Sequence, residues 1–212
     1  MPLHPQYCWM IRLRLLSLSF RATTRGLPVL IVAFLLVLRI AAQSWNPIGP
    51  DGGDARAIAA VPGEPAHLYL GTTTSILYES TDEGASWHRI ARLDSTDDLV
   101  IDHILVDPAN RSVIYAAAWK FDRPDGGLWV SRDAGKTWNE LPGLHGQSIR
   151  AFTQAPSNPN ILFAGTLQGV FRSNDAGSTW KQISPPGSTE IHEVESLAID
   201  PRNPDIGYAG TW

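Results

Sequence analysis

Hydrophobic residues in this chain fall into short runs rather than into long stretches with helical periodicity. Four runs of five to seven residues recur along it: Ala57–Val61, Val100–Val106, Ile149–Ala155 and Val194–Ile199. Each is followed by a segment rich in proline, aspartate or asparagine, and then by a second apolar run. Proline fixes φ and has no amide donor, so these segments are expected to be turns. The pattern predicts an all-β fold without long helices.

A repeated eight-residue motif organises these runs. It reads Ser-x-Asp-x-Gly-x-Ser/Thr-Trp and occurs at residues 80–87, 131–138 and 173–180. Its aspartates are 51 and 42 residues apart, which is the size of a four-stranded propeller blade. An aromatic landmark, Tyr or Phe at positions 69, 115, 163 and 208, repeats in step with the motif. The sequence therefore predicts a β-propeller of four-stranded antiparallel blades, with three complete blades and a partial fourth.

Each blade is expected to run through four strands, A to D. The four runs given above are the inner strands A, the aromatic landmark lies on strand B, strand C leads into the motif, and strand D begins at the motif tryptophan. The predicted blades cover residues 45–93, 94–143, 144–187 and, in part, 188–212. Propellers avoid free sheet edges by closing a ring of typically 4 to 8 blades. The sequence thus predicts an incomplete ring and an N-terminal fragment of a longer protein.

The motif has a mechanical explanation that requires no catalysis. The aspartate can accept hydrogen bonds from its own turn, the glycine supplies positive φ, and the serine hydroxyl can bond back to the chain. The tryptophan can pack between blades. We therefore expect the motif residues to be structural. They are Ser80, Asp82, Gly84, Trp87, Ser131, Asp133, Gly135, Trp138, Ser173, Asp175, Gly177 and Trp180.

The three motifs resemble the Asp-box, or bacterial neuraminidase repeat, of sialidases, sortilin-type receptors, family 74 xyloglucanases and the photosystem II assembly-factor group. The opening segment, residues 45–58 (WNPIGPDGGDARAI), is similar to the first blade of sortilin-like and assembly-factor-like exported bacterial propellers. The resemblance covers residues 45–212. It implies the fold, but such repeats carry many activities. It also implies that the ligand face lies opposite the motif, on the B-to-C and D-to-A connections; we call this surface the loop face.

Acidic residues dominate the predicted loop face. A glycoside hydrolase needs two carboxyl groups about 5 to 10 Å apart, and Asp51, Asp54 and Asp97 are the candidates for that role. Acidic residues are also the commonest way to keep loops soluble, so a non-catalytic surface is the simpler interpretation of them. Trp119 is either a sugar platform or an aromatic residue that packs between blades. The residues expected to form a binding face are Asp94, Asp98, Trp119, Asp122, Arg123, Glu190 and Glu193.

Departures from the catalytic members of the resemblance favour a non-enzyme. The chain has no Arg-Ile-Pro sequence, and Arg56 and Arg150 alone do not make the arginine triad of sialidases. Residues 50–54 (PDGGD) resemble the glycine-rich opening of family 74 enzymes only faintly, and a second catalytic acid would lie outside this chain. The six histidines lack the spacing of metal ligands, and no phosphate loop occurs. We predict neither a cofactor nor a metal.

The first 50 residues differ in composition from the rest. They contain five arginines, no acidic residue, and an apolar run at Val29–Leu38. Since a bilayer span needs about 20 apolar residues, this pattern predicts a signal peptide over residues 1–43 rather than an uncleaved anchor, although Met10 remains an alternative start to Met1. The only cysteine, Cys8, lies in this leader, and the acidic remainder argues against nucleic-acid binding. We expect a periplasmic or extracellular protein that meets a membrane only if the leader is retained.

Three functions are compatible with these features. The leading interpretation is a non-catalytic exported propeller that binds a protein or glycan partner across the loop face. The alternative is a glycoside hydrolase, sialidase-like or xyloglucanase-like, whose catalytic residues lie partly outside this chain. A third interpretation is an assembly factor for a membrane complex.

Overall fold

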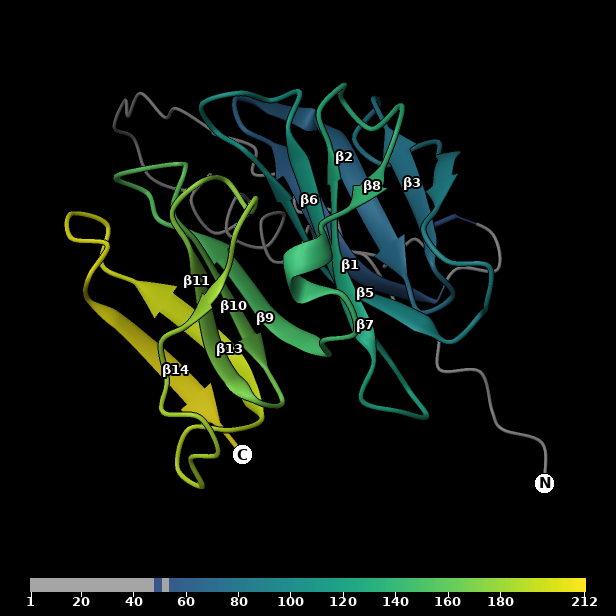
Figure 1. Ribbon diagram of the computed structural model, residues 1–212. Helices are drawn as coiled ribbons and strands as arrows, with labels where there is room; N and C mark the ends of the chain where they lie inside the picture. The colour runs from purple at the N-terminus through teal and green to yellow at the C-terminus, as the bar shows by residue number, and fades with distance from the viewer. Residues whose placement is uncertain (1–47, 51–53) are drawn as a thin grey trace, which may run out of the picture. The chain divides into compact units, whose positions relative to one another are not determined.

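The structure is a computed structural model that describes residues 48–50 and 54–212 (Figure 1). The predicted leader, Cys8 and the candidate acid Asp51 lie outside the described residues. The described part contains three four-stranded antiparallel sheets and one two-stranded sheet. Its only helical element is a single 3-10 turn, Pro142–Leu144 (η1), so no helix in this part is long enough to span a membrane. The all-β prediction is confirmed.

Within each four-stranded sheet, strands that are neighbours in space are also consecutive in sequence, which is the arrangement of a propeller blade. The three complete blades and the strand pair match the predicted order of strands A to D. Blade 1 contains β1 (Ala55–Val61), β2 (Glu64–Thr72), β3 (Ile76–Ser80) and β4 (His88–Arg92). Blade 2 contains β5 (Leu99–Val106), β6 (Ile114–Lys120), β7 (Gly126–Ser131) and β8 (Asn139–Glu140). Blade 3 contains β9 (Ile149–Gln154), β10 (Leu162–Thr166), β11 (Gly169–Ser173) and β12 (Lys181–Gln182), and blade 4 contains β13 (Val194–Ile199) and β14 (Gly207–Thr211).

The eight-residue motif forms the turn between strands C and D of each complete blade, and we call this turn the corner. In blade 2, the Ser131 hydroxyl donates to Asp133 Oδ1 at 2.8 Å and accepts from the Gly135 amide at 2.8 Å. The Thr137 amide and hydroxyl donate to the two carboxylate oxygens of Asp133 at 2.9 and 2.6 Å. The corresponding four distances in the other two corners agree with these within 0.1 Å. Three different sequences therefore adopt one hydrogen-bonded turn.

The corners of blades 2 and 3 pack against the preceding blade through their glycines. Gly135 has a φ of 85°, and a Cβ added there would lie 3.1 Å from Ile90 Cδ1 of blade 1. A Cβ added at Gly177 would lie 2.8 Å from Leu141 Cδ1 of blade 2. Any side chain at these positions would meet both a strained backbone and a close neighbour. The glycine is thus required by the turn and by the contact between blades.

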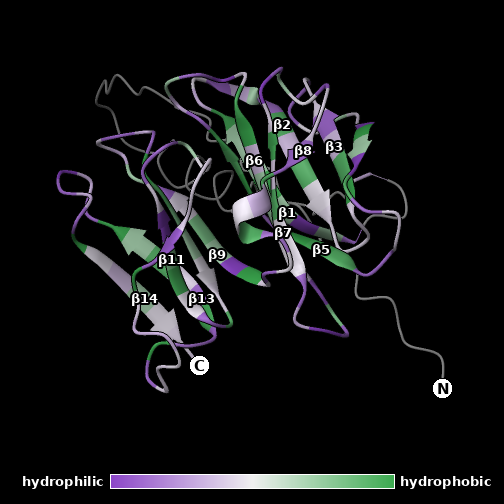
Figure 2. Ribbon diagram, viewed as in Figure 1, coloured by the Kyte–Doolittle hydropathy of each residue, from purple (hydrophilic) through white to green (hydrophobic). Residues whose placement is uncertain are grey.

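The apolar core lies between successive sheets. One cluster joins blades 2 and 3 through Tyr115, Leu141 and Phe152, among others, and a second joins blades 1 and 2 through Leu77 and Ile101. Tyr115 also donates a hydrogen bond from its hydroxyl to the corner carbonyl of Ala176 at 3.2 Å. Figure 2 shows the hydrophobic residues on the strands and the hydrophilic ones gathered in the connections. Packing between blades is therefore the main source of stability.

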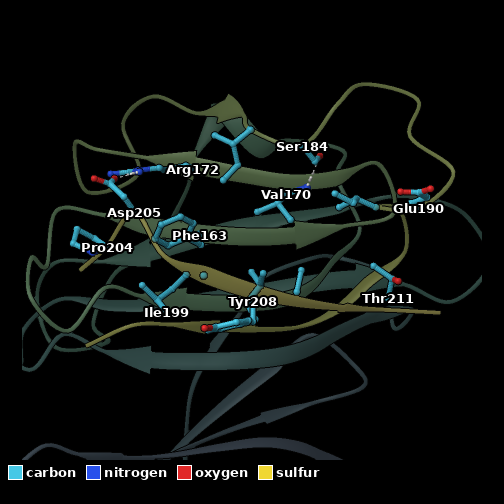
Figure 3. Close-up of a pocket in the computed structure, with 15 residues that line it drawn as sticks. Phe163, Val170, Arg172, Ser184, Glu190, Ile199, Pro204, Asp205, Tyr208 and Thr211 are labelled. Atoms are coloured by element: carbon cyan, nitrogen blue, oxygen red, sulfur yellow. Dashed lines mark hydrogen bonds and ion pairs between the residues drawn. The ribbon is translucent and has the colours of Figure 1, made fainter. Parts of the chain in front are cut away.

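A cavity of about 400 Å³ lies between blade 3 and the strand pair of blade 4 (Figure 3). In the figure, Phe163, Ile199 and Tyr208 line its middle, and the ion pair from Arg172 Nη1 to Asp205 Oδ1, 2.7 Å long, lies at one end. Ile183 occupies the same position in the repeat of blade 3 as Leu141 does in blade 2. It lines this cavity and is 50% exposed. The same position in the repeat is therefore buried in one blade and open in another.

This difference in burial predicts unequal effects of the same truncation. Leu141→Ala should lower the free energy of unfolding by about 2–4 kcal/mol, because Leu141 is 9% exposed and supports the Gly177 corner. Ile183→Ala should lower it by less than about 1 kcal/mol, because half of its surface already meets solvent. Urea unfolding of the two variants checks this, and equal losses would contradict the packing described.

The corners also predict a dependence of stability on pH. Hydrogen bonds from the hydroxyl and amide of Ser86, Thr137 and Thr179, and from the motif serine, hold the pKa of Asp82, Asp133 and Asp175 at about 2. Because the pKa is lower in the folded state, these carboxylates stabilise the fold above pH about 4, and that contribution is lost as the pH falls towards 2. The variant with all three aspartates changed to Asn should show a smaller decrease in melting temperature between pH 5 and pH 2.5, whereas Glu190→Gln should behave as wild type.

Candidate functional site

Each strand A begins with a β-bulge that holds a charged residue. The register shifts at these points leave Arg56, Asp102, Arg150 and Glu195 unpaired in β1, β5, β9 and β13. A bulge of this kind redirects a side chain at the rim of a sheet. The charges alternate in sign along the chain, and neighbouring blades are joined by ion pairs between Arg56 and Asp102 and between Arg150 and Glu195, the second 3.7 Å long. Both arginines that were compared with a sialidase triad thus pair with an acid of the next blade.

Trp119, at the end of β6, lies beneath two other side chains. The guanidinium carbon of Arg150 is 3.6 Å from the centroid of the Trp119 ring, and Trp119 is 8% exposed. Phe121 contacts the same ring edge-to-face, with a centroid distance of 4.9 Å, and is 63% exposed. Trp119 itself therefore offers little ring surface to a ligand. The exposed ring at this position belongs to Phe121, which no sequence pattern singled out.

Lys120 and Arg123 join two connections, the one at residues 94–98 before β5 and the one at residues 121–125 after β6. We call these two cations and the carboxylates that pair with them the Lys120 network. Lys120 Nζ lies 2.5 Å from Asp94 Oδ2 and 3.8 Å from both Asp98 Oδ1 and Asp125 Oδ2. Its side chain is 10% exposed. Arg123 pairs with the carboxylates of Asp98, Asp122 and Asp125 at 3.0, 2.8 and 3.2 Å. The structure thus brings together Asp94, Asp98, Asp122 and Arg123 around a lysine that was not predicted.

The charges of the Lys120 network fix its protonation. Burial alone would raise the pKa of Asp94, but hydrogen bonds from Lys120 and Thr96, with the charge of Lys120, lower it to about 2. The pKa of Asp98 is also lowered, first by a hydrogen bond from Thr96 and then by the nearby cations. The hydrogen bond to Asp94 raises the pKa of Lys120. A general acid needs a pKa near the working pH, so Asp94 and Asp98 suit charge pairing and hydrogen-bond acceptance rather than proton donation.

The remaining candidates lie apart from this network. Asp97 is exposed and pairs with Arg92 at 2.6 Å. Asp54 is exposed immediately before β1, and its carbonyl accepts a hydrogen bond of 3.0 Å from the Thr73 amide in the B-to-C connection of blade 1. Glu190 and Glu193 lie in the connection between β12 and β13, and Glu190 lines the cavity of Figure 3. Across residues 54–212, no three histidine, cysteine or acidic side chains are placed to hold a metal ion.

Comparison with known proteins relates the chain to propellers with known activities. The family model for sortilin (Sortilin-Vps10, neurotensin receptor 3) matches residues 126–209. A xyloglucanase from Paenibacillus sp is 27% identical over 214 residues, a match that covers 80% of this chain and 20% of the relative. A probable oligoxyloglucan-reducing end-specific xyloglucanase from Neosartorya fischeri is 27% identical over 135 residues, covering 62% of this chain and 16% of the relative. The chain thus spans about a fifth of the length of these relatives.

Solved structures agree on the fold. An ancestral GH74 enzyme superposes with a TM-score of 0.63 at 22% identity, covering 75% of this chain and 22% of that one. The GH74 xyloglucanase from Xanthomonas campestris superposes with a TM-score of 0.61 at 20% identity, covering 79% of this chain and 31% of that one. The chain has a β-propeller fold.

These comparisons correct the leading interpretation of the sequence. A non-catalytic binding module was expected, because the loop face lacks a complete set of catalytic residues. The matched relatives are xyloglucanases instead, which favours the glycoside hydrolase that the sequence had left as the alternative. The expectation failed because the absence of a complete site from one chain was taken as absence from the protein. This chain spans a fifth of the Paenibacillus relative, so the lack of a complete site within it does not exclude a catalytic protein.

Removing Lys120 should loosen the loops that it connects. Lys120→Met should lower the free energy of unfolding by about 1–3 kcal/mol, because it leaves Asp94 without its closest partner. The pKa of Asp94 should rise in the same variant, which carboxyl-carbon NMR titration can follow. Lys136→Met, an exposed position in the blade 2 corner, is the control and should change neither quantity. Equal effects of the two substitutions would contradict a special role for Lys120.

Proposed function

We propose that this chain is part of a glycoside hydrolase that cleaves a xyloglucan-type β-glucan, with the polysaccharide lying across the loop face. The observation that carries the proposal is that the matched relatives are xyloglucanases, aligned over as much as 80% of this chain. Superposition on family 74 structures supports the same architecture. The loop face supplies exposed carboxylates and an exposed aromatic ring, which are the groups that recognise and hydrolyse polysaccharides.

Among the described acids, Asp54 is the best candidate for a reacting carboxylate. Hydrolysis requires one carboxyl group to protonate the glycosidic oxygen and a second to activate water or attack the sugar. Asp94 and Asp98 are held in the Lys120 network, and Asp97 is paired with Arg92. Asp54 lies at the start of an inner strand, and no described residue forms an ion pair with it. Asp51, outside the described residues, remains a candidate, and we place the second acid outside this chain.

The proposal also covers the identity of the corners and the location of the protein. The corners are Asp-box repeats, which is supported by the identical hydrogen bonds of the three turns. The protein is exported by its leader to the periplasm or the extracellular space, where a polysaccharide substrate would be met; the composition of residues 1–43 supports this.

The test is hydrolysis of xyloglucan by the intact protein, measured as the release of reducing ends. Asp54→Asn should reduce kcat by about 100-fold or more, because general acid–base catalysis contributes at least that much. Asp205→Asn, in the A-to-B connection between β13 and β14, should leave the rate unchanged. Loss of activity in Asp97→Asn but not in Asp54→Asn would reject the assignment of Asp54. Failure of the intact protein to cleave any β-glucan would reject the function.

A further inference from the structure

Phe121 places a large apolar ring in water on the loop face. It follows β6 directly and begins the B-to-C connection of blade 2, where it is 63% exposed. Single exposed hydrophobic residues are common and need no explanation by themselves. Phe121 differs because its ring rests on a buried aromatic ring. Its ring meets the buried Trp119 ring edge-to-face at 4.9 Å, and Trp119 is held in turn by Arg150 at 3.6 Å.

This support makes Phe121 a preorganised surface. An exposed side chain normally loses rotamer freedom when a ligand orders it, and that loss weakens binding. Here a supporting contact, with Trp119 of blade 2, exists before any ligand arrives, and Trp119 is itself covered by Arg150 of blade 3. The apolar face of a pyranose ring is the kind of flat, rigid surface that packs on a fixed aromatic ring. On the basis of the proposed function, we infer that Phe121 is the platform of a sugar-binding subsite.

Polar groups around the ring fit a hydroxyl-rich ligand. The Lys120 network begins at the residue next to Phe121 and holds carboxylates and a guanidinium in fixed positions. Beneath Phe121, the Nε1 of Trp119 and the Nε of Arg150 are buried and have no hydrogen-bond partner among the described residues. These two donors lie below the surface, so the polar groups open to a ligand are those of the Lys120 network. The site thus combines one apolar surface with several polar partners.

The charge at this position selects the class of sugar. Lys120 and Arg123 are two cations, set against four carboxylates, so the Lys120 network has a net charge of −2. The four carboxylates are those of Asp94, Asp98, Asp122 and Asp125. Such a surface repels sialic acids and uronic acids and does not act on an uncharged glycan. The subsite therefore takes a neutral sugar. A protein partner fits less well, because charged side chains rather than further apolar ones flank Phe121.

The test compares Phe121→Ala, Phe121→Trp and the control Tyr208→Ala, another exposed aromatic residue that lines the cavity of Figure 3. Binding of a neutral xyloglucan oligosaccharide to the intact protein is measured by calorimetry, and KM and kcat are measured with xyloglucan. Phe121→Ala should weaken binding and raise KM about 5- to 10-fold, the scale of one aromatic stacking contact, with kcat unchanged. Phe121→Trp should retain wild-type affinity, and Tyr208→Ala should have no effect.

Several outcomes would overturn the inference. Wild-type affinity in Phe121→Ala would reject the subsite, as would binding of a sialylated or uronic-acid oligosaccharide as tight as that of the neutral one. Equal loss in Phe121→Ala and Phe121→Trp, with an unchanged melting temperature, would also reject stacking. A different result would reject the proposed function while leaving the subsite intact. If the intact protein binds the oligosaccharide through Phe121 but never cleaves it, the protein is a glycan-binding protein and not a hydrolase. Cleavage with a wild-type KM in Phe121→Ala rejects the subsite alone.

Discussion

The corner between strands C and D is the constraint on which the rest of this structure depends. Its aspartate and serine satisfy amide donors and hydroxyls that a tight turn would otherwise leave to water, so the turn holds its shape without help from neighbours. Its glycine then lets that rigid turn approach an aliphatic side chain of the preceding blade. The corner glycine therefore serves both the hydrogen-bonded turn and the packing between blades. The spacing of successive sheets therefore follows from the corner.

The opposite ends of the strands are organised by charge. Inner strands begin with bulges that turn charged side chains towards the neighbouring blade, and the Lys120 network joins the loops beyond them. These pairs fix the loops with little apolar contact, which leaves the connection after β6 polar around the exposed ring of Phe121. A rigid scaffold carrying a polar, preorganised face suits the binding of an extended carbohydrate chain. Under the proposed function, stability and recognition thus occupy different ends of the same blades.

The sequence predicted the strands and corners well because each is decided locally. The positions of Tyr69, Tyr115, Phe163 and Tyr208, and the three motifs, are enough to place nearly every strand. The Lys120 network was not predictable, because it joins residues from separate connections whose approach depends on how two blades pack. The bulge charges had a signal that was overlooked: Arg56, Asp102, Arg150 and Glu195 each precede the aromatic landmark of their blade by 13 residues. The burial of Trp119 beneath Arg150 of the next blade and the exposure of Phe121 are set by packing between blades, which composition does not reveal.

The charge of the bulge residue alternates in sign from one blade to the next. A positive blade is followed by a negative one, so the natural unit of this architecture is a pair of blades rather than a single blade. Duplication or deletion of one blade would set like charges side by side, whereas a change by two would preserve every pairing.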